Sequence, residues 1–133
     1  AMARMADPSD QPEIRQRAAA RICAAMAAEP FYVHGSNAFA TDVITIAGPD
    51  VLVKGGAEGV YAAILPALGL GVALKIDDGG SRAAELAMIH TLDQIGGLSD
   101  QHATALTQRL SPVQTNWAGT DVGSLRPAAT FLI

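Results

Sequence analysis

The sequence has few of the residues that mark disulfide-bonded, nucleic-acid-binding or membrane proteins. Its 133 residues include one cysteine, which cannot form an internal disulfide and suits a reducing cytosol. The nine basic residues are scattered and the net charge is -4, which excludes the clustered lysines and arginines of a nucleic-acid footprint. No apolar run approaches the roughly 20 residues of a membrane span. We therefore expect a cytoplasmic protein with no nucleic-acid or membrane partner.

What the chain does contain is apolar, because 50% of its residues are hydrophobic and 17% are charged. This composition differs from that of disordered chains, which have too little apolar surface to bury. A length of 133 residues suits a single domain with a core of its own. We therefore interpret residues 1–133 as one folded unit.

Runs of β-branched and aliphatic residues between glycine- and proline-containing turns indicate four strands. The predicted strands span residues 42–47, 51–54, 60–65 and 71–76. The first two are joined by Gly48-Pro49-Asp50 and form a predicted hairpin. The last two are almost entirely apolar, which predicts a sheet that is covered on both faces.

Apolar residues at helical spacing predict three helices. The helices run from Pro12 to Pro30, from 82 to 95 after an N-cap at Ser81, and from Ser99 to about 110. Residues 31–40 are predicted to be irregular, and residues 112–133 to hold turns and a strand near 122–125. Helices on either side of an antiparallel sheet place the chain in the α+β class.

The most informative stretch is the block from Lys54 to Gly59, in which a lysine ends an apolar run and meets a glycine-rich turn. Serine acyl-enzymes of the penicillin-binding type place a Lys-x-Gly at such a strand end, facing the nucleophile. An ammonium there can stabilise an anionic intermediate and lower the pKa of a neighbouring lysine or serine. The alternative is a solvated lysine. We expect Lys54 at the end of a central strand, beside strand 71–76 or strand 42–47.

The residues after Lys54 are candidates for substrate binding. Gly55, Gly56 and Gly59 allow close backbone approach or a positive φ and could present amide donors to an oxyanion. Their alternative role is a tight turn. The carboxylate of Glu58 could bind a substrate ammonium, pair with Lys54, or cap a turn.

The other polar residues point to structural roles. Asp77 and Asp78, after Lys75, read as a turn that leads into the next helix and lack the ligand spacing of a calcium loop. Cys23 lies among alanines, as small core residues do. The histidines, of which His34 directly precedes Gly35, are far apart and have no helical ligand spacing, so we expect no metal site in this chain.

Several segments, above all the block 54–59, match the pattern of one family. The segments are 30–35, Thr41, 54–59, 75–79, 82–84, 116–119 and 122–123. On these residues the chain resembles the L-asparaginase II family of amidohydrolases, which have a serine β-lactamase-like fold. The resemblance implies an antiparallel β-sheet flanked by helices. It also implies that residues 1–133 are the C-terminal portion of a longer enzyme.

The resemblance further implies roles and departures. Lys54 would be the lysine of the third conserved motif, close to the catalytic serine, and the glycines near it would shape the pocket. The usual threonine after it is Gly55 here, and an arginine that the family usually has is replaced by Ala38. The family's zinc ion, held by two cysteines and a lysine, would lie in the missing half, so no cofactor is expected in this chain.

The chain lacks the family's nucleophile motif, Ser-x-x-Lys. None of its serines has a lysine three residues on: Ser9, Ser36, Ser81, Ser99, Ser111 and Ser124. We therefore expect an enzyme that hydrolyses the side-chain amide of L-asparagine to L-aspartate and ammonia, with this chain inactive alone. Its partner would be the N-terminal half or a second copy, covering apolar residues exposed at 51–53 and 60–65.

Two alternatives remain open at this point. The first is a non-enzymatic α+β domain that binds a small amino acid or pairs with another subunit through a sheet edge. The second is a penicillin-binding-like fragment that acts on peptides.

Overall fold

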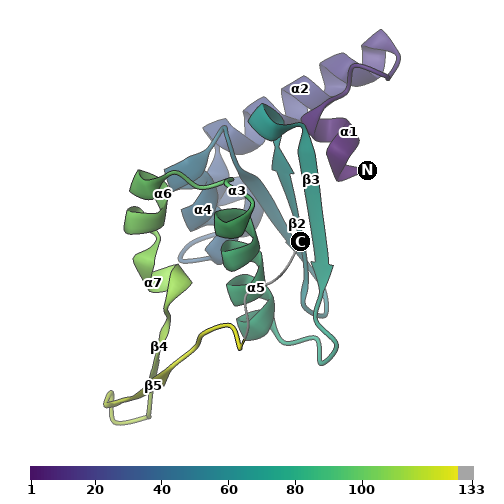
Figure 1. The fold of residues 1–133 in the computed structure, drawn as a ribbon. Coiled ribbons are helices and arrows are strands. Elements are labelled where there is room, and N and C mark those ends of the chain that lie inside the picture. The colour runs from purple at the N-terminus through teal and green to yellow at the C-terminus, as the bar shows by residue number, and fades with distance from the viewer. Residues whose placement is uncertain (129–133) are drawn as a thin grey trace.

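The computed structural model describes residues 1–128, and it is an α+β structure with an antiparallel sheet flanked by helices (Figure 1). The main sheet has the order β1-β2-β3. Its strands are β1 (Leu52–Gly56), β2 (Val60–Leu65) and β3 (Leu70–Lys75). A second, two-stranded sheet pairs β4 (Val113–Thr115) with β5 (Asp121–Ser124).

Helices precede and follow the main sheet. They are α1 (Met2–Ala6), α2 (Glu13–Ala28), α3 (Pro30–His34), α4 (Phe39–Ala47), α5 (Ser81–Gln94), α6 (Asp100–Ala105) and α7 (Thr107–Leu110). A single 3-10 turn, Pro66–Leu68, joins β2 to β3. Within residues 1–128 no helix has the length and apolarity needed to cross a membrane.

The two faces of the main sheet pack against different helices. One face, here called the α5 face, packs Val53, Ala63 and Leu65 against Met88 and Leu92 of α5. The opposite face, here called the α1 face, carries a smaller apolar cluster in which Leu52 and Ile64 meet side chains of α1 and α2. Figure 1 shows α5 on one side of the strands and α1 and α2 on the other. β1 and β2 are thus mostly covered, whereas exposed residues alternate along β3.

The predicted strands 60–65 and 71–76 are confirmed as the antiparallel pair β2 and β3. The predicted helix after Ser81 is also confirmed, with Gly80 rather than Ser81 as its N-cap. Ser99 does cap α6, because its hydroxyl accepts from the His102 amide and the His102 ring in turn accepts from the Ser99 amide.

The prediction of a strand over 42–47 is wrong, because these residues belong to helix α4. The helix buries Phe39, Ala40, Val43, Ile44 and Ala47, which recur at helical spacing once the window begins before residue 42. Burial of this face outweighs the preference of the β-branched residues for strands. The predicted hairpin with 51–54 is therefore also wrong, and β1 pairs with β2.

Three smaller differences concern the helices and the C-terminal region. Residues 31–40 are not irregular throughout, because a new helix, α3, begins at Pro30 and continues to His34. The helix predicted after Ser99 divides at Leu106 into α6 and α7. The strand near 122–125 is β5, its partner β4 was not predicted, and the last residues of that region, 129–133, lie outside the described part of the chain.

The expectation that apolar residues at 51–53 and 60–65 would be exposed is also wrong. Val51, Leu52 and Val53 are at most 1% exposed, because the chain's own helices cover them. Large apolar side chains are exposed elsewhere, on α2, α3, the 3-10 turn, β3 and the β4–β5 hairpin. They are Ile14, Ile22, Phe31, Tyr32, Leu68, Leu70, Val113, Trp117 and Val122.

Candidate functional site

Lys54 lies in the edge strand β1, opposite Ala62 of β2, and not in a central strand beside 71–76 or 42–47 as predicted. Side chains alternate along a strand, so Lys54 is on the same face as Leu52, the α1 face. Its side chain is exposed, and Nζ donates to the carbonyl oxygen of Gly55 at 2.5 Å. In the described part of the chain Lys54 makes no ion pair with a carboxylate. The ammonium is thus available to an anion.

The turn after Lys54 connects β1 to β2 through Ala57, Glu58 and Gly59. Glu58 and Gly59 both have positive φ, at 58° and 69°. A Cβ on Gly59 would lie 3.0 Å from the backbone of Gly79, so glycine is needed there for close packing as well as for φ. Glu58 is exposed at the tip and does not pair with Lys54 within residues 1–128. The contacts of Glu58 and Gly59 are those of a turn.

Gly55 faces an aromatic ring on the neighbouring strand that leaves little room for a side chain. Gly55 lies opposite Tyr61, and a Cβ added to it would lie 3.2 Å from two ring carbons. Tyr61 is buried on the α5 face and packs edge-to-face on Phe39, with ring centroids 5.2 Å apart. On the α5 face, the Tyr61 ring therefore covers Gly55, the residue that follows Lys54 in β1. Gly56 is exposed and lies at the end of the strand.

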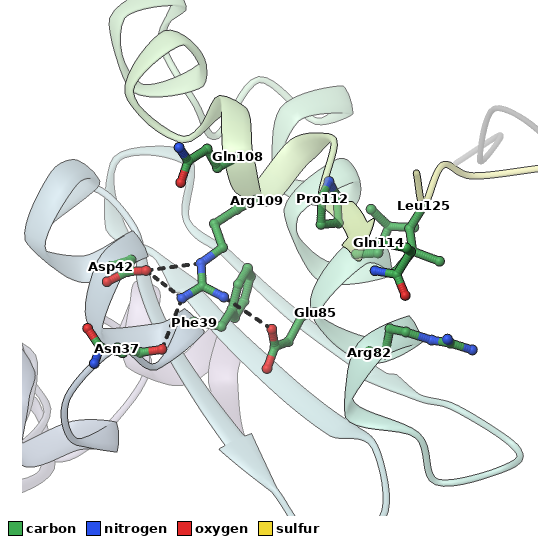
Figure 2. A pocket seen from close by; sticks show the side chains of 11 residues that line it. Asn37, Phe39, Asp42, Arg82, Glu85, Gln108, Arg109, Pro112, Gln114 and Leu125 are labelled. Atoms are coloured by element: carbon green, nitrogen blue, oxygen red, sulfur yellow. Dashed lines mark hydrogen bonds and ion pairs between the residues drawn. The ribbon is translucent and has the colours of Figure 1, made fainter. Parts of the chain in front are cut away.

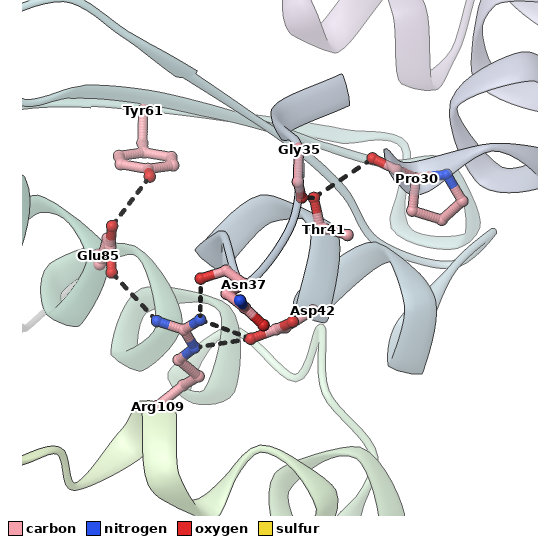
Figure 3. A network of polar contacts seen from close by, with 8 residues as sticks. All are labelled: Pro30, Gly35, Asn37, Thr41, Asp42, Tyr61, Glu85 and Arg109. Carbon is pink, nitrogen blue, oxygen red and sulfur yellow. Dashed lines mark hydrogen bonds and ion pairs between the residues drawn. The ribbon is translucent and has the colours of Figure 1, made fainter. Parts of the chain in front are cut away.

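A polar network extends from Tyr61 across three helices (Figure 3). The Tyr61 hydroxyl donates to Glu85 at 3.5 Å, and the other oxygen of Glu85 faces Arg109 at 3.5 Å. Arg109 donates to one oxygen of Asp42 from two nitrogens, at 3.0 and 2.6 Å. It also donates to the carbonyl of Asn37 at 3.1 Å. The network connects α4, α5 and α7 with β2.

The surroundings of Tyr61 shift the pKa of its phenol. Burial raises the pKa of Tyr61 to about 12, and the Glu85 carboxylate beside the hydroxyl adds to the shift. The phenol therefore stays protonated and remains a hydrogen-bond donor throughout the neutral range.

A hollow of about 400 Å³ lies on the α5 face, between α4, α5, α7 and the β4–β5 region (Figure 2). It is lined by Asn37, Phe39, Asp42, Arg82, Glu85, Leu86, Gln108, Arg109, Pro112, Gln114 and Leu125. None of the residues predicted to act with Lys54 lines it. The hollow and Lys54 are thus on opposite sides of the sheet.

The predicted residues of the block 54–59 lie together because they are one hairpin, whereas the residues of the hollow could not be found from the sequence. Tyr61, Glu85 and Arg109 are separated by 24 residues or more, and Asp42 is 67 residues from Arg109. No short spacing pattern joins them. Of the residues that line the hollow, only Arg82 lies in one of the segments on which the sequence resemblance rests, 82–84.

Residues 1–127 match the model of the family described as L-asparaginase II. The chain belongs to the L-asparaginase II family. No match was found among curated proteins.

Two departures from the L-asparaginase II pattern acquire physical reasons in this member. A threonine in place of Gly55 would put its Cβ 3.2 Å from the Tyr61 ring, so the glycine makes room for that ring. Ala38, where the family usually has an arginine, is the residue before α4. A guanidinium nevertheless lies next to that position, because Arg109 of α7 bonds the carbonyl of Asn37.

The resemblance to this family implies a zinc ion whose ligands lie outside this chain, and the cysteine and two of the histidines of residues 1–128 make other contacts. Cys23 is partly buried beside Met26 and Met5, and burial raises the pKa of its thiol. No group of three histidine, cysteine or carboxylate side chains converges within residues 1–128. His102 is occupied in the α6 cap, and His90 bonds the carbonyl of Leu110 at 2.8 Å. We derive no chemical step through zinc.

The remaining predicted residues have structural contacts in this L-asparaginase II member. Asp78 accepts from the amide of Gly80 at 2.7 Å, which confirms the predicted turn before α5. Lys75 donates from Nζ to the carbonyl of Ile76, the same arrangement that Lys54 has with Gly55. His34 lies beside Tyr61, with ring centroids 6.3 Å apart.

Proposed function

We propose that this chain provides the lysine-bearing wall of a site that hydrolyses the side-chain amide of L-asparagine to L-aspartate and ammonia. The family match over residues 1–127 carries the proposal, together with an exposed Lys54 on an edge strand. The chain lacks Ser-x-x-Lys, so the nucleophile comes from another part of the enzyme, the N-terminal half. In the cytosol, where we place the enzyme, Cys23 stays reduced.

The proposed chemistry gives each group one task. A serine, deprotonated by the lysine of its own motif, attacks the amide carbon and forms a tetrahedral oxyanion. The ammonium of Lys54 lowers the free energy of the anionic states, because an opposite charge a few ångströms away favours them. The amide nitrogen takes up the proton that the lysine of the Ser-x-x-Lys motif removed from the serine and leaves as ammonia, and water then hydrolyses the acyl-enzyme ester to release aspartate. Gly56, two residues after Lys54 and so on the same face of β1, leaves the wall beside the lysine free of a side chain.

The fold supports the same assignment. Three antiparallel strands followed by a helix packed on the α5 face fit the last strands and terminal helix of a serine β-lactamase-like domain. On the α1 face, β1 and β3 present the exposed residues Lys54, Ala73 and Lys75. We place the N-terminal half along the β1 edge of this face, where its serine would reach Lys54, and not against Lys75, which lies on β3 at the other edge of the sheet.

The test combines the chain with the missing motif. The chain is co-purified with the N-terminal half of an L-asparaginase II enzyme that carries Ser-x-x-Lys, and ammonia release from L-asparagine is measured. We expect activity from the pair and none from the chain alone above a heat-killed control. Lys54→Met should lower kcat/KM of the pair by about 100-fold or more, in the range found when one group that stabilises an oxyanion is removed.

Lys75→Met is the matched control, because both lysines are exposed strand residues bonded to the next carbonyl. It should leave kcat/KM within about twofold. Ammonia release by the chain alone would contradict the proposed division of the site. Equal losses for the two variants would contradict the role of Lys54.

A further inference from the structure

The hollow on the α5 face has the dimensions and lining of a small-molecule site. Its volume of about 400 Å³ lies within the roughly 300–1,000 Å³ of such sites. Phe39 and Leu86 give it an apolar floor, and both are buried. Gln108 and Gln114 add amide groups at its sides. An apolar floor with a few polar groups around it is the usual composition of a ligand pocket.

The two carboxylates in the hollow, Asp42 and Glu85, differ in how closely Arg109 contacts them. Arg109 faces two carboxylates, so the three groups together carry one negative charge. Asp42 holds the guanidinium tightly, with its shortest contact at 2.6 Å. Glu85 is held loosely, at 3.5 Å from Arg109 and 3.5 Å from the Tyr61 hydroxyl. The negative charge available to a ligand is therefore on Glu85.

A positive charge, that of Arg82, lies one helical turn from Glu85. Arg82 precedes Glu85 by three residues on α5, so both side chains emerge on the same side of the helix and both line the hollow. The Arg82 side chain makes no ion pair or hydrogen bond with any residue in the described part of the chain. Figure 2 shows its side chain extended away from Glu85. The hollow therefore has separate positive and negative groups on one wall.

We propose that this hollow binds a free α-amino acid as its zwitterion, with the carboxylate on Arg82 and the ammonium on Glu85. A guanidinium holds a carboxylate with two parallel hydrogen bonds, which gives it both affinity and orientation. The side chain of the amino acid lies over Phe39 and Leu86. The site is distinct from the Lys54 wall, which is on the opposite face of the sheet, and it goes beyond the proposed hydrolysis.

The test is a titration of the purified 133-residue chain with L-alanine, followed by calorimetry or by amide NMR shifts. We expect saturable binding, with shifts in the first turns of α5. Propionate lacks the ammonium and L-alaninamide lacks the carboxylate, so each should bind at least about tenfold more weakly. Equal affinity for L-alanine and propionate, or the absence of saturable binding, would overturn the proposal.

Variants locate the site. Arg82→Gln should weaken L-alanine binding at least about tenfold, and Arg82→Lys, which keeps the charge but loses the paired hydrogen bonds, should lie between Arg82→Gln and the unchanged chain. Arg15→Gln on α2 and Lys54→Met should bind as the unchanged chain does. Thermal unfolding of each variant checks that it is folded. Loss of binding in Lys54→Met but not in Arg82→Gln would place the amino acid at the Lys54 wall and overturn the proposal, whatever the outcome of the hydrolysis assay.

Discussion

At the scale of single residues, the contact between Gly55 and Tyr61 accounts for how β1, the strand that carries Lys54, packs on its α5 face. The Tyr61 ring covers the position where a side chain of residue 55 would be, and it is buried against Phe39. Aromatic residues opposite glycine are a known way to stabilise a strand that glycine weakens. The α5 face of β1 is thereby fixed while its α1 face keeps Lys54 exposed.

We predict that Gly55→Ala destabilises the chain. The new Cβ would lie 3.2 Å from the Tyr61 ring, which cannot move without loosening its contact with Phe39 and its bond to Glu85. Overpacking of this kind typically costs about 1–3 kcal/mol of the free energy of unfolding, which urea denaturation measures.

The control for this change is Gly123→Ala, in another strand. A Cβ on Gly123 meets no atom within 4 Å, and its φ needs no glycine. This variant should be within about 0.5 kcal/mol of the unchanged chain. Equal unfolding midpoints for the two variants would show that the Tyr61 ring does not constrain residue 55.

The sequence led to Lys54 because a lysine beside glycines is a local pattern. It could not lead to Tyr61, Glu85 or Arg109, because their contacts depend on how separate elements pack. Their side chains are also ordinary for their positions, since a tyrosine in an apolar strand and a glutamate in a helix indicate nothing by themselves. Contacts between distant segments are decided by the fold and have no signature in one sequence.

At the scale of elements, the same contrast separates β2 and β3 from α4. The pair β2–β3 was predictable because each apolar run is short and is bounded by proline or glycine. Residues 42–47 satisfied the strand criteria equally well, but they are the second half of a helix. The apolar positions that reveal it begin at Phe39, in a segment that Gly35 and Asn37 made look irregular. A short apolar run does not distinguish a strand from a buried helix.

The element contact most open to test is the ion pair between α7 and α4. Arg109 bonds Asp42 and faces Glu85, and its side chain is only 28% exposed. We predict that Arg109→Met, which keeps the apolar stem, lowers the free energy of unfolding by about 1.5–3 kcal/mol, because two carboxylates lose their partner.

Arg17→Met is the comparison for that pair. Arg17 pairs with Glu13 at 3.5 Å within α2, and both side chains are more than two-thirds exposed. Exposed pairs of this kind contribute about 0.5 kcal/mol or less. Chemical denaturation of both variants decides the matter. Similar losses would mean that the α4–α7 pair acts as a surface pair does.

At the scale of the whole molecule, the apolar surface lies where the sequence did not place it. β1 and β2 are covered by α1, α2, α4 and α5, so the exposed large apolar side chains are on the outside of α2 and α3, on the 3-10 turn, at the start of β3 and on the β4–β5 hairpin. Ile14 on α2 is 71% exposed and Tyr32 on α3 is 82% exposed. Exposed apolar groups that adjoin one another mark interaction surfaces or aggregation sites.

We predict that the purified chain associates, with a second copy or with the N-terminal half when that is supplied. Light scattering over a range of concentrations should give a mass above that of the 13.7 kDa monomer. Ile14→Glu should reduce the association, whereas Glu58→Gln at the hairpin tip should not. A monodisperse monomer at high concentration would contradict this prediction.

The packing of the β1–β2 turn has a consequence for how Lys54 is presented to a partner. The amide of Ile76 donates to the carbonyl of Gly59, and Gly59 and Gly79 are in close contact, so the hairpin tip is attached to the loop before α5. A free hairpin tip loses conformational entropy when a partner docks, which weakens binding. Here most of that entropy is already lost on folding. The lysine therefore stands on a pre-organised frame, and the docking that we propose for a serine-bearing half would need to order little more than the lysine side chain.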